Sequence, residues 1–287
     1  MIAGEFREVA RCRGAAGGIV ADGQEVLFSA PDEDRIYRYD PAGESVSVER
    51  SYTGRINGLD RAPDGSLFAA QSGSRRIVIL EPSGAMTMPA ERIGGKVHNH
   101  PAQVSIDGAG RVWFSDPCSP IPAPGAQVHP ALPPAILRLS RDHRRYWRIQ
   151  RMTDAPVEPY GVQVSPDGAE LYVTSNGERA DVRAYPVGSD GSLGMHRVLH
   201  TFSEDYRGAH RAGRGMTFHD GLLLVCAGAP EAGPGALVYA FEPSGRVVAT
   251  ASVPAAPNCC RVIDGKLYVS TVEGSLLEAD YILRSQL

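Results

Sequence analysis

Six short segments hold the residues of this chain that are best suited to chemistry. The segments are Ala16-Gly17-Gly18, Ile56-Asn57-Gly58, Pro101-Ala102-Gln103, Pro159-Tyr160-Gly161, Gly213-Arg214-Gly215 and Pro257-Asn258-Cys259. Tyr160 can donate or accept a proton, and the permanent charge of Arg214 can hold a carboxylate or a developing oxyanion. We therefore predict Tyr160 and Arg214 as catalytic residues and Asn57 and Asn258 as groups that orient a substrate. The opposing interpretation is a pocket filled by a stacked tyrosine and arginine with no catalytic role.

A second group of polar residues precedes or follows the third segment. The His98-x-His100 spacing in an extended loop places both imidazoles on one face, and Asp116 follows a strand nearby in the sequence. Such a group could bind a transition metal, but its members more often hydrogen-bond loops or act singly as acid or base. We therefore predict no metal, His100 as a third catalytic residue, and His98, Gln103, Asp116 and His210 as substrate contacts.

The elements that must position these residues are strands, because one strand-and-turn unit recurs six times. The first strand of each unit is Val26–Ser29, Leu67–Ala70, Val112–Ser115, Leu171–Thr174, Leu223–Cys226 or Leu267–Ser270. A partner strand follows each, at 35–39, 76–80, 135–139, 182–185, 236–241 and, with a weaker pattern, 275–279. Repeats of this length stack radially. The sequence predicts an all-β fold, a six-bladed β-propeller, as one domain over residues 1–287.

In a propeller the loop entering each innermost strand places a side chain at the mouth of the central channel. The six segments above occupy these entries, so we expect Ala16, Asn57, Ala102, Tyr160, Arg214 and Asn258 to form a ring. The proline-rich insert between Pro117 and Pro134 is expected to be a loop on one rim and a candidate lid.

Composition limits the function classes. The chain has 287 residues, 43% hydrophobic and 22% charged, with a net charge of −4, which does not favour nucleic-acid binding. No signal-peptide pattern or membrane-length apolar run occurs, so we expect a cytoplasmic protein that does not bind membranes. The five cysteines have no zinc-binding spacing, and a disulfide framework is not expected.

Several motifs resemble those of the senescence marker protein (regucalcin), gluconolactonase and luciferin-regenerating enzyme family over nearly the whole chain. They are Ile56-Asn57-Gly58-Leu59 with Asp64-Gly65, Gly95-Lys96-Val97-His98-Asn99-His100-Pro101 leading to Val112-Trp113-Phe114-Ser115-Asp116-Pro117, Pro159-Tyr160-Gly161-Val162 with Ser165-Pro166-Asp167-Gly168, Asp190-Gly191-Ser192-Leu193-Gly194, and Cys259-Cys260 ahead of Leu267-Tyr268-Val269. The resemblance implies a six-bladed propeller with lactonase-type hydrolysis.

The resemblance also implies one divalent cation, held by a Glu, two Asn and an Asp. The positions that align with these ligands are Ala16, Ala102, Tyr160 and Arg214. Two alanines offer no side-chain ligand, and Arg214 brings a positive charge to the place of the cation. We therefore expect no cofactor and no metal.

These observations together predict a metal-independent enzyme that acts on a small carbonyl-bearing or anionic molecule, by lactone or ester hydrolysis. Two alternatives remain open: an isomerase or cyclase that uses the tyrosine and arginine, and a propeller that binds a small molecule without turnover. The only partner expected is the small-molecule substrate, and the protein is expected to be a monomer or weak homodimer.

Overall fold

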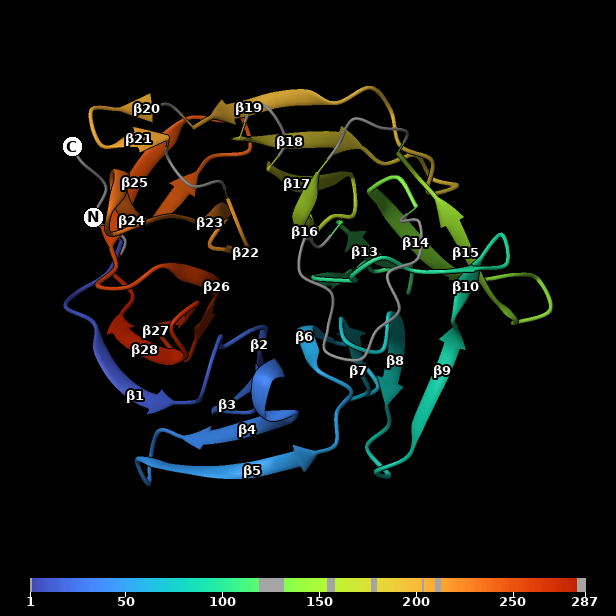
Figure 1. Ribbon diagram of the computed structural model, residues 1–287. Helices are drawn as coiled ribbons and strands as arrows, with labels where there is room; N and C mark the ends of the chain where they lie inside the picture. Colours follow the sequence, from blue (N-terminus) through green and yellow to red (C-terminus); the bar gives the residue numbers. More distant parts are fainter. Residues whose placement is uncertain are drawn as a thin grey trace.

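Six four-stranded antiparallel sheets surround a central axis in the computed structural model (Figure 1). The structure describes residues 2–118, 132–153, 158–176, 180–202, 204–209 and 213–282. Its only helical element in these ranges is a short 3₁₀ turn, Pro31–Glu33. The predicted six-bladed β-propeller is confirmed.

Each blade runs outward from an inner strand. Blades one to three consist of β2 (Ile19–Asp22), β3 (Glu25–Ala30), β4 (Arg35–Asp40) and β5 (Ser45–Ser51); β6 (Ile56–Arg61), β7 (Leu67–Gln71), β8 (Arg76–Leu80) and β9 (Met86–Ala90); and β12 (Val104–Ile106), β13 (Val112–Asp116), β14 (Ala135–Arg141) and β15 (Trp147–Arg151). Blades four and five consist of β16 (Pro159–Val164), β17 (Glu170–Asn176), β18 (Ala180–Pro186) and β19 (Arg197–Thr201); and β22 (Met216–His219), β23 (Leu222–Ala229), β24 (Ala232–Phe241) and β25 (Val247–Ser252).

Blade six joins the two ends of the described chain. Its strands are β26 (Pro257–Ile263), β27 (Lys266–Thr271), β28 (Ser275–Asp280) and, as the outermost strand, β1 (Arg7–Arg11). Arg7 is paired with Glu278 in the β1–β28 ladder, and its guanidinium also donates to that carboxylate at 3.1 Å. No strand is predicted at Arg7–Arg11 from the sequence, so this closure is found only in the structure.

The core lies between blades because successive strand residues face opposite sides of each sheet. Trp113 of β13 packs against Val162 and Val173 of blade four, whereas its neighbour Phe114 packs against Phe68 of blade two. Trp113 and Phe114 are both fully buried. Burying a side chain of this size stabilises the fold by about 1.5–3 kcal/mol, so each such strand holds two neighbouring blades together.

Two hairpins that the sequence analysis does not predict lie between blades. They are β10 (Arg92–Ile93) with β11 (Lys96–Val97), and β20 (Glu204–Asp205) with β21 (Gly208–Ala209). Each precedes one of the predicted entry segments. Most of the predicted lid, Pro117–Pro134, falls outside the described residues. All five cysteines are free thiols, as expected, and the described part of the chain has no helix capable of spanning a bilayer.

Candidate functional site

The predicted entry ring, Ala16, Asn57, Ala102, Tyr160, Arg214 and Asn258, forms where the inner strands begin. Four of these residues are joined by side-chain contacts around the Tyr160 hydroxyl. The Asn57 amide nitrogen donates to Tyr160 Oη at 3.4 Å, and Tyr160 Oη donates to Asn258 Oδ1 at 3.1 Å. Blades two, four and six therefore meet at one phenol.

The orientation of the Asn258 amide is fixed by the backbone of blade one. Asn258 is buried, and its Nδ2 donates to the Ala16 carbonyl oxygen at 2.8 Å. Because a carbonyl can only accept, the amide must direct Oδ1 toward Tyr160 and Arg214. The hydroxyl proton of Tyr160 consequently points to Asn258, and a lone pair of the same oxygen, Oη, accepts from Asn57.

Arg214 covers the same tyrosine from blade five. Its guanidinium carbon lies 5.2 Å from the centre of the Tyr160 ring, and Nη1 donates to Asn258 Oδ1 at 3.4 Å. A cation over an aromatic face is stabilised by the ring quadrupole, which holds the guanidinium in place without neutralising it. The site thus combines a positioned phenol with a positive charge.

A glycine after four of the ring residues lets neighbouring inner strands approach closely. A methyl group added there would lie within 2.8 Å of the next ring residue's carbonyl oxygen at Gly17, Gly58, Gly161 and Gly215. At Gly161 the distance to the Arg214 oxygen would be only 2.0 Å. Residues with a Cβ would separate the blades here, so these glycines set the width of the entry ring.

Hydroxyl groups on the second strands fix the backbone of the ring. In four blades a side-chain hydroxyl donates to a carbonyl at the next blade's entry: Ser29 to Asn57, Ser115 to Tyr160, Thr174 to Arg214 and Ser270 to Gly17. Thr174 Oγ1 also accepts the Gly161 N–H at 2.7 Å, and therefore bridges blades four and five. Tyr160 lies within β16, and the carbonyl of Arg214, just ahead of β22, is held by Thr174.

His100 lies at the entry of blade three, and its contacts define its tautomer. Its Nδ1 lies 3.1 Å from the Ser72 carbonyl oxygen, so Nδ1 carries the proton and Nε2 has a free lone pair. Burial, followed by the charges of Arg75 and Arg55, lowers the pKa of His100. A neutral imidazole with a free lone pair can accept a proton from water.

His98 and Asp116, predicted as substrate contacts, are instead enclosed. The ring of His98 packs edge-on against Phe114, and its Nδ1 lies 3.8 Å from Asp116 Oδ2. The two carboxylate oxygens of Asp116 accept the backbone N–H groups of Asn99 and His100 at 3.0 and 2.8 Å. In this geometry Asp116 positions the loop that carries His100.

The pH dependence of stability tests this role of Asp116. Burial raises the pKa of Asp116 from 3.8 to about 6, although the two N–H bonds oppose the rise. A raised carboxyl pKa means that stability is greatest below the unfolded value and is lost as pH rises through 6. Between about pH 4 and pH 7 this group should reduce the free energy of unfolding by about 3 kcal/mol. Denaturant unfolding of Asp116→Asn should show a smaller loss over that range, and an unchanged pH dependence would contradict the assignment.

The remaining predicted residues have different environments. Gln103 is buried, and its backbone N–H donates to Ser115 Oγ at 3.1 Å, which leaves its side chain inside the blade-three entry. His210 lies outside the described residues. Glu158, which the sequence analysis does not select, precedes Tyr160 by two positions, and burial raises its pKa. The only sequence signal for Glu158 is this proximity.

At the opposite end of the inner strands, an ion pair and its hydrogen bonds join four blades. Arg261 of β26 donates to Asp60 of β6 at 3.0 Å and to Thr217 of β22 at 3.2 Å. The second oxygen of Asp60 accepts the Ile106 N–H at 2.9 Å. The charges of Arg261 and Asp60 are therefore satisfied by the protein itself.

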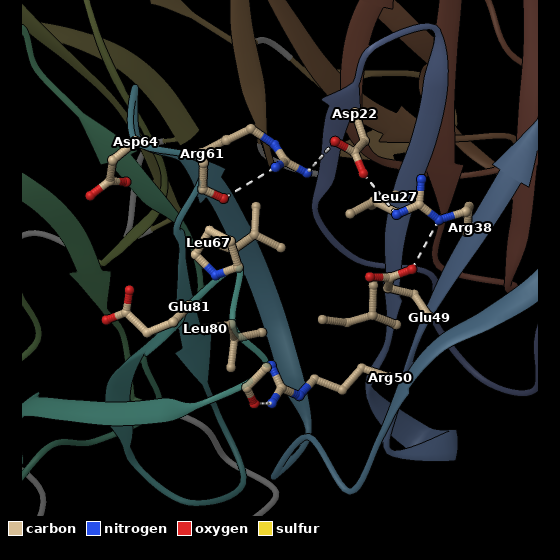
Figure 2. Close-up of a pocket in the computed structure, with 14 residues that line it drawn as sticks. Asp22, Leu27, Arg38, Glu49, Arg50, Arg61, Asp64, Leu67, Leu80 and Glu81 are labelled. Atoms are coloured by element: carbon tan, nitrogen blue, oxygen red, sulfur yellow. Dashed lines mark hydrogen bonds and ion pairs between the residues drawn. The ribbon is translucent and has the colours of Figure 1, made fainter.

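A groove of about 620 Å³ between blades one and two is a separate concave surface (Figure 2). Figure 2 shows Arg38 and Arg61 reaching toward Asp22, with which they pair at 2.7 and 3.2 Å. Arg38 also pairs with Glu49 at 2.9 Å. These arginines are neutralised by carboxylates of the groove, which makes them links within and between blades.

The entry ring does not suit a divalent cation. Ca²⁺ prefers about 6–8 oxygen ligands, whereas Ala16 and Ala102 have only methyl side chains and Arg214 is itself a cation in contact with Asn258. His98 and Asp116 do not supply an alternative with His100, because both are buried and both Asp116 oxygens already accept backbone N–H groups. Within the described ranges, no group of three or more His, Cys, Asp or Glu residues is arranged to hold a metal.

Comparisons with known proteins agree with this architecture. The family model "SMP-30/Gluconolactonase/LRE-like region" matches residues 15–273. A gluconolactonase of Zymomonas mobilis is 27% identical over 260 residues, covering 84% of this chain and 70% of that protein.

Solved structures with the same fold include a gluconolactonase of Xanthomonas campestris, with a TM-score of 0.81, 21% identity and coverage of 98% of this chain and 91% of that one. A regucalcin of Agrobacterium tumefaciens has a TM-score of 0.74, 15% identity and coverage of 96% and 94%. The matched region includes all six entry-ring positions, from Ala16 of blade one to Asn258 of blade six. The chain therefore belongs to the SMP-30/gluconolactonase/LRE-like family.

Proposed function

We propose that this protein hydrolyses a lactone or ester of a small molecule at the entry ring, without a bound divalent cation. Lactonase-type hydrolysis is supported by the family. Metal independence is supported by one observation above all: a half-buried guanidinium lies over Tyr160 among the residues that align with the family's cation ligands.

In the proposed reaction a water oxygen adds to the acyl carbon and the bond from that carbon to the ring or ester oxygen breaks. As negative charge develops on the carbonyl oxygen, the second hydrogen of the Asn57 amide donates to it, and the Tyr160 O–H turns from Asn258 Oδ1, which keeps its bond from Arg214, to donate to it as well. The positive charge of Arg214 stabilises the same oxygen. His100 Nε2 accepts the proton from water, and the leaving oxygen is protonated to an alcohol. The products are a carboxylate, an alcohol and a proton.

A second reaction class, isomerisation or cyclisation, is favoured by the position of Tyr160 Oη, which both accepts and donates a hydrogen bond. Such a group can return a proton to another atom of the same substrate. Reaction in ¹⁸O-labelled water separates the two classes, because only hydrolysis places the label in the product carboxylate. Binding without any turnover would favour the non-catalytic alternative.

Chelation tests the metal-free mechanism. Purified protein treated with excess EDTA and then desalted is expected to retain its full rate on a panel of five- and six-membered lactones. The physical reason is that the charge beside the carbonyl comes from Arg214. A rate that falls on chelation and returns with added Ca²⁺, Zn²⁺ or Mn²⁺ would exclude this mechanism.

A further inference from the structure

The guanidinium of Arg214 keeps most of its hydrogen-bonding capacity unused. An arginine side chain has five N–H donors, and the structure gives this one a single hydrogen bond, the 3.4 Å contact with Asn258 Oδ1. Its other contact is with the face of Tyr160. Among the residues that the structure describes, no carboxylate pairs with it.

Other half-buried arginines show how unusual this is within the molecule. Five arginines of intermediate burial pair with carboxylates: Arg38 with Asp22, Arg61 with Asp22, Arg111 with Asp107, Arg183 with Asp181 and Arg261 with Asp60. Other arginines for which the described part of the chain offers no carboxylate partner donate to carbonyl groups instead: Arg138 to the Asp190 carbonyl and the Gln150 side chain, Arg75 to the His98 and Asn99 carbonyls, Arg151 to the Pro133 and Pro134 carbonyls, and Arg50 to the Gly84 carbonyl. A charge left unpaired at the entry ring is therefore specific to Arg214.

The entry ring also has more free donors than free acceptors. Asn57 Nδ2 uses one of its two hydrogens on Tyr160, and Asn57 Oδ1 faces Gly17, where an added methyl carbon would lie 2.8 Å from it. Asn258 Oδ1 already accepts from both Tyr160 and Arg214. A ligand that completes this ring must supply acceptors and negative charge.

We propose that Arg214 anchors a carboxylate of the substrate, so that the preferred substrates are carboxylate-bearing lactones or esters rather than neutral ones. The planar fork of a guanidinium matches a carboxylate with two parallel hydrogen bonds, and one positive charge balances one negative charge. With the carboxylate on Arg214, the Tyr160 hydroxyl and the free Asn57 hydrogen remain for the reacting carbonyl. The reaction in this inference rests on the proposed function, whereas binding of the carboxylate can be measured without any turnover.

Binding is tested with molecules that cannot be hydrolysed. The probes are tetrahydrofuran-2-carboxylate and its neutral counterpart 2-methyltetrahydrofuran, and binding is measured by calorimetry on the full chain. Wild-type protein and Tyr160→Phe are expected to bind the carboxylate, and neither should bind the neutral ether. Arg214→Ala should weaken carboxylate binding about tenfold or more, and Arg214→Lys should restore part of it, because lysine keeps the charge but loses the fork.

Matched variants protect this test from misfolding. Arg261→Ala removes an arginine of similar burial at the opposite end of the inner strands and should leave binding unchanged, provided that its thermal unfolding shows a folded protein. If Arg214→Ala is unstable, the comparison of Arg214→Lys with wild type decides. Equal binding of the two probes by wild type, or carboxylate binding that is insensitive to Arg214, would overturn the proposal.

Turnover distinguishes this inference from the proposed function. The substrates are γ-valerolactone and the corresponding lactone with a carboxylate in place of the methyl group. Carboxylate binding without turnover of either lactone would refute hydrolysis and leave the anchor in place. Equal turnover of both lactones would support hydrolysis and refute the anchor.

Discussion

Replacing Tyr160 with phenylalanine is expected to lower kcat by about a hundredfold or more, the usual contribution of one hydrogen-bond donor to a developing oxyanion. The substitution removes the one oxygen that Asn57 donates to and that itself donates to Asn258, while the ring that supports Arg214 remains. The measurement is steady-state hydrolysis of the best lactone in the panel, with circular dichroism to verify the fold.

A matched substitution controls for loss of a phenol elsewhere. Tyr52 is 91% exposed, so Tyr52→Phe should have the wild-type rate. A Tyr160→Phe protein that turns over at the wild-type rate would mean that the phenol fills space and that the proposed chemistry is wrong. Loss of substrate affinity with unchanged kcat would assign Tyr160 to binding alone.

Replacing Gly161 with alanine is expected to destabilise the protein by about 3 kcal/mol or more, at the upper end of overpacking effects. The added carbon would lie 2.0 Å from the Arg214 carbonyl oxygen and 2.8 Å from Thr174 Oγ1. Neither neighbour can move freely, because Thr174 bonds both Gly161 and Arg214. For a chain of this size we expect the melting temperature to fall by on the order of 10 °C in a thermal scan.

Gly108→Ala is the control for this prediction. An added carbon at Gly108 meets no heavy atom within 4 Å, and its backbone is not in the left-handed region, so stability should change little. Equal melting temperatures for Gly161→Ala and Gly108→Ala would show that neighbouring inner strands can separate without cost. The close approach of blades four and five would then have no role in setting the ring.

Local patterns were sufficient to predict the blades. Each second strand follows a glycine turn and carries alternating large side chains, as at Val112–Ser115, where Trp113 and Phe114 face different neighbours. The entry ring follows from the same repeat, because one position at or just ahead of the start of each inner strand recurs six times. Six-fold repetition therefore predicts both the fold and the residues that meet at its axis.

Burial at the third entry was not predictable from spacing. The two histidines and Asp116 have metal-like spacing in the sequence, yet the carboxylate accepts backbone N–H groups and His98 packs on Phe114. Backbone N–H groups occur in every residue except proline, so the residue types do not indicate which of them bind Asp116. Only the three-dimensional path of the loop separates a positioning carboxylate from a ligand.

The hydroxyl contacts do have a sequence signal, which the analysis of the sequence did not use. The six strands predicted as the first of each unit, and found as the second of each blade, have Ser29, Ala70, Ser115, Thr174, Cys226 or Ser270 as their fourth predicted residue. Small polar residues at a position that is otherwise fully buried indicate a partner on another element. That partner is the carbonyl at the next blade's entry. The sequence of one repeat cannot identify it, because the partner belongs to a different repeat.

The pairing of β1 with β28 has a consequence for how the molecule is made. Residues 7–11 leave the ribosome more than 260 residues before their hydrogen-bonding partners at 275–278, so the outermost strand of blade six remains unpaired while the strands between them are made. Likewise, the Ala16 carbonyl cannot accept its hydrogen bond from Asn258 until that residue has been synthesised. Contacts this distant in sequence slow folding and make it cooperative. A nascent chain that lacks blade six would thus expose a strand edge. It would also lack Asn258, which orients Tyr160 and Arg214, so the site can form only when the ring of blades closes.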